Sequence, residues 1–111
     1  MLLNVAPVSV GVGSDRLPRA LELVGVRPNP ARGVVRMTLR LPRSGPAEVE
    51  ILDLAGRRVA LLPTGDILPA GERTLAWDRR TGSGVVARSG LYFVRVRAAG
   101  SECVGKIILL D

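Results

Sequence analysis

The chain has 111 residues, 47% of them hydrophobic, which is enough for one domain with one modest core. Sixteen basic residues against ten acidic ones give a net charge of +6, but the arginines are scattered and lack aromatic neighbours that could stack on bases. We therefore expect no nucleic-acid binding. The sequence contains no histidine, which excludes serine-histidine-acid triads, cysteine-histidine pairs and most zinc sites.

The first part of the chain, residues 1–19, is predicted to be a linker or the tail of a preceding domain. Residues 1–13 are apolar but lack the basic start and the cleavage site of a signal peptide. Residues 14–19 are polar and contain a proline, as linkers often do. No apolar run approaches the roughly 18 residues of a membrane span. The domain is therefore assigned to residues 20–111.

Seven short runs of β-prone residues follow, separated by turns that are rich in glycine and proline. No segment shows a sustained helical period. The expected strands are residues 20–26, 34–41, 47–53, 57–62, 72–78, 91–97 and 102–110. Strands of this number and spacing predict an all-β fold, a seven-stranded immunoglobulin-like β-sandwich.

Three segments between these strands are distinctive. The first is the turn Arg27-Pro28-Asn29-Pro30, and the second is the strand end and tight turn over residues 52–59. The third, residues 77–92, runs from Trp-Asp through a loop of glycine and serine to Leu-Tyr. Together they resemble the FlgD-like immunoglobulin-type domain and the closely similar C-terminal sorting domain of type IX secretion cargo. The resemblance covers roughly residues 20–110.

The chain departs from the family pattern at three places. Arg79 stands where glycine usually follows Trp-Asp, and Thr81 replaces a frequent aspartate. Near the chain end only Lys106 is basic, where sorting signals often have more basic residues. These departures weaken the sorting interpretation more than the fold assignment.

Charge suggests which strands are neighbours. Glu48 and Glu50 are expected on the outward face of the third strand, and Arg95 and Arg97 on the outward face of the sixth. Immunoglobulin-type sandwiches place these two strands side by side. The alternative is a simple hairpin of the second and third strands, which would place Arg40 opposite Glu48. The resemblance favours the first arrangement.

The core is expected to consist mainly of inward aliphatic side chains, because the chain has only one tryptophan, one tyrosine and one phenylalanine. Trp77 is interpreted as a core indole, and the alternative is an exposed platform that stacks on sugars. Tyr92 is expected to be packed, with its hydroxyl on a backbone group. The predicted core residues are Val35, Met37, Leu39, Val49, Ile51, Leu75, Trp77, Tyr92, Val94 and Val96.

No residues are predicted to be catalytic, to bind a cofactor or to hold a metal. Asp53 and Asp78 could form a carboxylate pair, but each ends a strand before turn residues, so both are expected to accept hydrogen bonds from turn N–H groups. Cys103, as the single cysteine, cannot form an intramolecular disulfide and is expected to be a small buried side chain. No aspartate-rich loop of calcium-binding spacing occurs.

The resemblance implies a non-enzymatic C-terminal module of a larger exported protein, a sorting or anchoring signal for secretion. The expected partners are the secretion machinery or neighbouring domains of the same chain. The expected location is secreted or at the cell surface. Two alternatives are a structural or assembly module, as in the flagellar hook cap, and a carbohydrate-binding accessory domain.

Overall fold

The computed structural model describes residues 20–111, and the predicted linker at residues 1–19 lies outside the described part. The described part contains seven strands, β1 (Glu22–Arg27), β2 (Val35–Leu41), β3 (Ala47–Leu52), β4 (Arg58–Leu62), β5 (Gly71–Trp77), β6 (Gly90–Ala98) and β7 (Ser101–Leu109). All seven predicted strands are confirmed, with ends that differ by one or two residues at most. No helix in residues 20–111 is long and apolar enough to cross a membrane.

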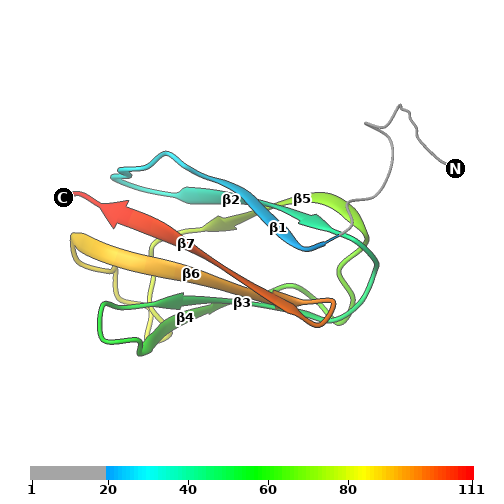
Figure 1. The fold of residues 1–111 in the computed structure, drawn as a ribbon. Helices are drawn as coiled ribbons and strands as arrows, with labels where there is room; N and C mark the ends of the chain where they lie inside the picture. Colours follow the sequence, from blue (N-terminus) through cyan, green and yellow to red (C-terminus); the bar gives the residue numbers. More distant parts are fainter. Residues whose placement is uncertain (1–19) are drawn as a thin grey trace, which may run out of the picture.

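Two antiparallel sheets form a sandwich (Figure 1). One has the strand order β1-β2-β5, and the other has the order β4-β3-β6-β7. The alternating pattern of β2 shows why the sheets pack, because every second side chain, from Val35 to Leu41, is buried. The predicted fold class is therefore confirmed. The largest side chains buried between the sheets are Trp77, Met37, Leu39, Leu41, Ile51, Ile107, Leu109, Val35, Val49, Val94 and Val96.

Two predicted core residues lie at the margin of the core rather than inside it. Leu75 and Tyr92 are half-buried and pack against the central cluster from its edge. Both stand on the inward face, but Leu75 belongs to β5, which has no strand on its far side. Cys103 is also half-buried, and its thiol contacts the backbone oxygen of Leu21 at 3.3 Å. The other predicted core residues are fully buried.

The predicted neighbour of β3 is confirmed. β3 pairs with β6, and the register places Glu48 opposite Arg97 and Glu50 opposite Arg95. The alternative hairpin of β2 and β3 is wrong because those strands belong to different sheets, whose apolar faces meet in the core. Arg40 instead lies on the other sheet.

Glu50 is outward-facing as predicted, yet it is buried, with only 6% of its surface exposed. Two arginines shield the Glu50 carboxylate from solvent: Arg95 contacts it at 2.7 Å and Arg58 at 3.4 Å. The hydrogen bond from Arg95 is the main cause that lowers the pKa of Glu50, ahead of the opposing effect of burial. The sequence predicted the direction of this side chain and Arg95 on the strand beside it, but neither the contact with Arg58 nor the burial of Glu50.

β1 closes the sandwich over β7, and the contact depends on a glycine. A Cβ atom built at Gly105 would lie 2.4 Å from the Leu23 side chain and 3.3 Å from that of Val94. Leu23 belongs to β1 and Val94 to β6, so Gly105 lets a leucine from the opposite sheet approach the backbone of β7.

Candidate functional site

The second half of β7 is held by the loop that joins β1 to β2. The side-chain amide of Asn29 donates to the oxygen of Lys106 and accepts from the N–H of Ile108, both at 2.9 Å. Two residues later, the backbone of Ala31 donates to Ile108 and accepts from Leu110, both at 2.8 Å. The loop therefore acts as a short parallel strand that covers this part of the edge of β7.

The sequence explains why a side chain makes half of these bonds. Pro28 and Pro30 flank Asn29, and proline has no backbone N–H to donate. The amide of Asn29 supplies both a donor and an acceptor at this point. Ala31 is the first residue after the prolines, and its own N–H is used. The distinctive turn is thus the segment that fixes the end of β7.

Arg79 fixes the same segment from the loop between β5 and β6. It is buried, with 7% of its surface exposed, and among residues 20–111 it has no acidic partner within salt-bridge distance. Its guanidinium donates to the oxygen of Ala87 and to that of Arg32, each at 2.9 Å, and also to the oxygen of Leu110. One side chain therefore joins three segments through their backbone oxygens.

Two of the three departures from the family pattern, Arg79 and Thr81, lie in this loop. Arg79 has φ 68°, in the left-handed region that favours glycine, which is the residue that the pattern expects there. Thr81 replaces an aspartate at the loop tip, where its backbone bonds Val85 and Gly84 and its hydroxyl contacts that of Ser83 at 3.0 Å. The sequence marked both positions but did not show what the side chain of Arg79 contacts.

Trp77 and Tyr92 form the base of this loop. Trp77 is 1% exposed, and its indole N–H donates to the oxygen of Arg80 at 2.9 Å. The ring of Tyr92 meets it edge-to-face with centroids 6.0 Å apart, and the Tyr92 hydroxyl donates to the oxygen of Arg88 at 2.9 Å. Trp77 is therefore a core residue as predicted, and the alternative of an exposed sugar-stacking platform is wrong.

Asp53 and Asp78 serve two different turns, as predicted. Asp53 accepts hydrogen bonds from the backbone N–H groups of Ala55 and Arg57, both at 2.9 Å. The bond from Arg57 is the main cause that lowers the pKa of Asp53, and the bond from Ala55 lowers it further. Asp78 accepts from the N–H of Arg80 at 3.0 Å. In residues 20–111, the side chains of cysteine, aspartate and glutamate form no group of three or more that could hold a metal ion.

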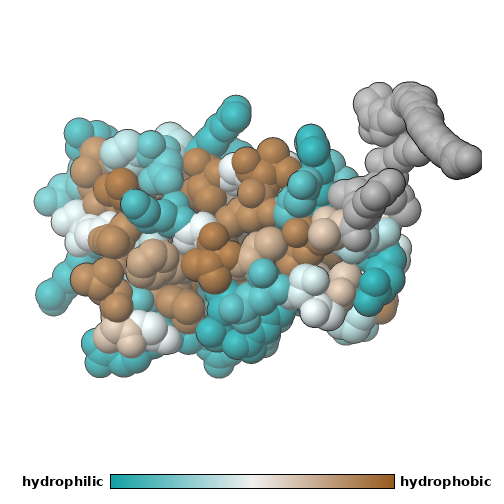
Figure 2. Space-filling view, viewed as in Figure 1, coloured by the Kyte–Doolittle hydropathy of each residue, from teal (hydrophilic) through white to brown (hydrophobic). Residues whose placement is uncertain are grey.

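A band of apolar residues lies beside the fixed end of β7. Figure 2 shows hydrophobic residues gathered across the middle of the face that β1 and β7 present, with hydrophilic residues around them. The exposed members from these two strands are Val24, Val104 and Ile108, and the last two alternate with Lys106 on the outward face of β7. This surface is therefore mixed, with one cation between two exposed aliphatic side chains.

The fold is similar to parts of two solved structures. Dimeric latent PorU from Porphyromonas gingivalis matches 91% of this chain, with a TM-score of 0.61 and 24% sequence identity. PorZ, described as an essential bacterial surface component of the type-IX secretion system of P. gingivalis, matches 78% of this chain, with a TM-score of 0.53 and 21% identity. No protein-family model matches the chain, and no curated protein is significantly similar to it.

The chain spans about a tenth of the length of each of these structures. It therefore corresponds to one small domain of proteins that are much larger. At this level of identity the likeness shows the fold alone, a β-sandwich domain similar to a part of PorU and to a part of PorZ.

Proposed function

We propose that this domain is a non-catalytic module at the C-terminal end of a larger exported protein, and that it acts as a sorting or anchoring signal. The observation that supports this most is the likeness of nearly the whole chain to one small domain of PorU and of PorZ. The three distinctive segments of the sequence support it independently. The proposed location is the cell surface or the secreted fraction.

In this proposal, the secretion machinery recognises the folded surface of β7 rather than a free tail. Asn29 and Arg79 hold the end of β7 through its backbone, so its side chains alternate reliably between the core and solvent. The outward side chains Val104, Lys106 and Ile108 are then presented in a fixed order. If the end of β7 were released, this fixed order would be lost although all three side chains would remain.

A reporter assay tests the proposal. The whole chain is fused behind a secreted reporter in a bacterium that has type IX machinery, and surface exposure is measured by protease shaving. We expect the intact fusion to reach the surface and Asn29→Ala to reduce the surface fraction, because it frees the edge of β7. Deletion of residues 106–111 is expected to abolish sorting.

Two controls separate recognition from folding. Lys106→Ala changes one exposed side chain while its backbone bond to Asn29 remains, so lost sorting in this variant would reflect recognition. Circular dichroism of each purified fusion reports whether the domain is folded. A folded fusion that stays in the periplasm would refute the sorting role, and a structural or assembly module would take its place.

A further inference from the structure

The outward face of the three-stranded sheet has an uneven distribution of charge. The registers of β1, β2 and β5 place its side chains in three rows that cross the sheet. From one end to the other, the rows are Glu22, Arg40 and Glu72, then Gly25, Thr38 and Thr74, then Arg27, Arg36 and Ala76. The first row holds two acids and one arginine, and the last row holds two arginines and no acid.

The other strand arginines on the outward faces have acidic partners. Arg95 contacts Glu50 at 2.7 Å, and Arg97 contacts Glu102 at 3.0 Å. In the first row of the three-stranded sheet, Arg40 lies between two glutamates at 3.6 and 3.4 Å. The pairing of charges across strands is therefore a general feature of this domain, and the last row is an exception to it.

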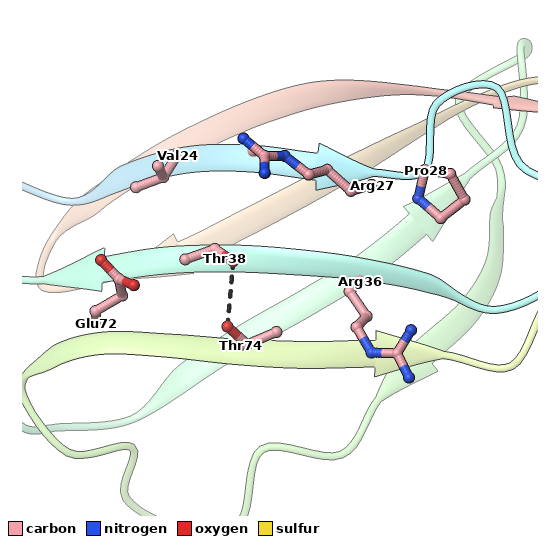
Figure 3. A pocket seen from close by; sticks show the side chains of 8 residues that line it. Val24, Arg27, Pro28, Arg36, Thr38, Glu72 and Thr74 are labelled. Carbon is pink, nitrogen blue, oxygen red and sulfur yellow. Dashed lines mark hydrogen bonds between the residues drawn. The ribbon is translucent and has the colours of Figure 1, made fainter.

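Arg27 and Arg36 lie directly opposite each other, and among residues 20–111 neither has an ion pair or a side-chain hydrogen bond. Like charges at opposed positions of a sheet are destabilising. Figure 3 shows the two side chains pointing apart, that of Arg27 back along β1 and that of Arg36 across the end of β5. The two guanidinium groups are therefore held apart, and no acidic side chain of residues 20–111 pairs with either of them.

A shallow groove of about 400 Å³ lies between them on this face. Gly25, which has no side chain, lines the groove, and a Cβ built there would be in ordinary van der Waals contact with the Nε atom of Arg27 at 3.8 Å. The hydroxyls of Thr38 and Thr74 form the middle of the groove and contact each other at 3.1 Å (Figure 3). That contact uses one hydroxyl proton, which leaves the other proton available for a ligand.

We propose that this groove binds an oxyanion, a phosphate or carboxylate group, between Arg27 and Arg36. Both side chains are exposed, so they can turn towards an anion by side-chain rotation alone. The planar guanidinium group matches the geometry of both kinds of oxyanion. The free threonine proton adds a neutral donor. Glu72 repels a second anionic group at the far end, so the site accepts one.

Amide NMR spectra of the whole chain test this proposal at constant ionic strength. Inorganic phosphate and acetate are titrated separately, with chloride as the reference salt. We expect saturable shifts of the amides of Arg27, Arg36 and Thr38 with at least one of the two oxyanions. Saturation by phosphate alone would identify a phosphate site, and saturation by both would identify a general oxyanion site.

Matched variants distinguish a site from general charge attraction. Arg36→Gln is expected to weaken binding by about tenfold or more, since hydrogen bonds to charged groups are strong. Arg43→Gln removes the same charge from an exposed arginine of the β2–β3 connection, and it should leave binding almost unchanged. Shifts that rise linearly with concentration, or that fall equally in both variants, would overturn the proposal.

A measurement without ligand gives a second, independent test. If Arg27 and Arg36 repel each other in the free protein, Arg36→Gln should raise the melting temperature at low salt relative to Arg43→Gln. The difference should shrink as salt is added, because salt screens exposed charges. A lower melting temperature for Arg36→Gln would show that Arg36 has a stabilising partner and would overturn the argument from unbalanced charge.

Discussion

Glu50 and Arg79 are both charged and both buried, but the two regions that bury them are built differently. Glu50 lies on a regular sheet face and is neutralised by arginines from the two neighbouring strands. Arg79 lies in a loop and is surrounded by backbone oxygens from three segments. The first arrangement follows from strand pairing, whereas the second exists only when distant loops meet. The contribution of Glu50 to the free energy of unfolding should therefore depend on pH, whereas that of Arg79 should depend on its hydrogen bonds.

The largest effect is expected at Trp77, which supports the loop that carries Arg79. Trp77→Ala removes a fully buried indole and its bond to Arg80, and we expect a loss of about 3–5 kcal/mol in the free energy of unfolding. Chemical denaturation of the purified chain measures this loss. Trp77→Phe should lose less because it retains most of the buried ring. An unchanged denaturation midpoint in Trp77→Ala would place the indole at the surface.

Arg79→Ala should have the next largest effect, about 2–3 kcal/mol, because it removes charge-assisted hydrogen bonds from a buried guanidinium to the backbone oxygens of Ala87 and Arg32. Arg79→Gly should lose somewhat less, since glycine adopts the observed positive φ without strain. Arg80→Ala is the matched control, since Arg80 is exposed and its guanidinium has one loop partner, the oxygen of Gly84. Equal losses for Arg79→Ala and Arg80→Ala would contradict the assigned role.

Glu50→Gln should cost about 1–2 kcal/mol at neutral pH, because it removes the negative charge between Arg95 and Arg58. The pKa of Glu50 is lowered from 4.5 in the folded state, so its ion pairs stabilise the fold above that pH. This stability is lost as the pH falls through the folded-state pKa. The difference between the wild type and Glu50→Gln should therefore disappear in acid.

A matched control sharpens the test at Glu50. Glu48→Gln on the same strand removes an exposed ion pair with Arg97 at 3.6 Å, and it should cost no more than about 0.5 kcal/mol. Denaturation of the wild type and both variants between neutral pH and pH 3 gives the comparison. A constant difference between the wild type and Glu50→Gln across this range would show that Glu50 does not stabilise the fold as a carboxylate.

Much of the fold could be predicted from the sequence because a strand has a period of two residues. The alternation of Val49 and Ile51 with Glu48 and Glu50 indicates which side chains face the core. The charges on β6 fit β3 as its neighbour, but Arg40 on β2 offered the same kind of pairing, so the family resemblance selected the arrangement that the register confirms. The face to which a side chain points is therefore a local property, whereas the choice of the neighbouring strand needed the family resemblance.

The contacts of the candidate site could not be predicted in the same way. Arg79 binds residues 47 and 31 positions away, and no local pattern indicates which oxygens a loop arginine will meet. The sequence signal was an arginine at a glycine position, which indicates an unusual backbone but not a partner. The sequence indicated Asn29 only as part of a turn, although its side chain forms hydrogen bonds with the backbone of β7.

Amide hydrogen exchange along the outer edge of β7 tests most directly whether the end of this strand is fixed. The N–H of Ile108 is bonded to Asn29, whereas at Val104, four positions earlier on the same edge, no strand of residues 20–111 pairs with β7. We predict that Ile108 and Leu110 exchange much more slowly than Val104, and that Asn29→Ala removes the protection of Ile108. Equal, rapid exchange at all three amides in the wild type would contradict the account.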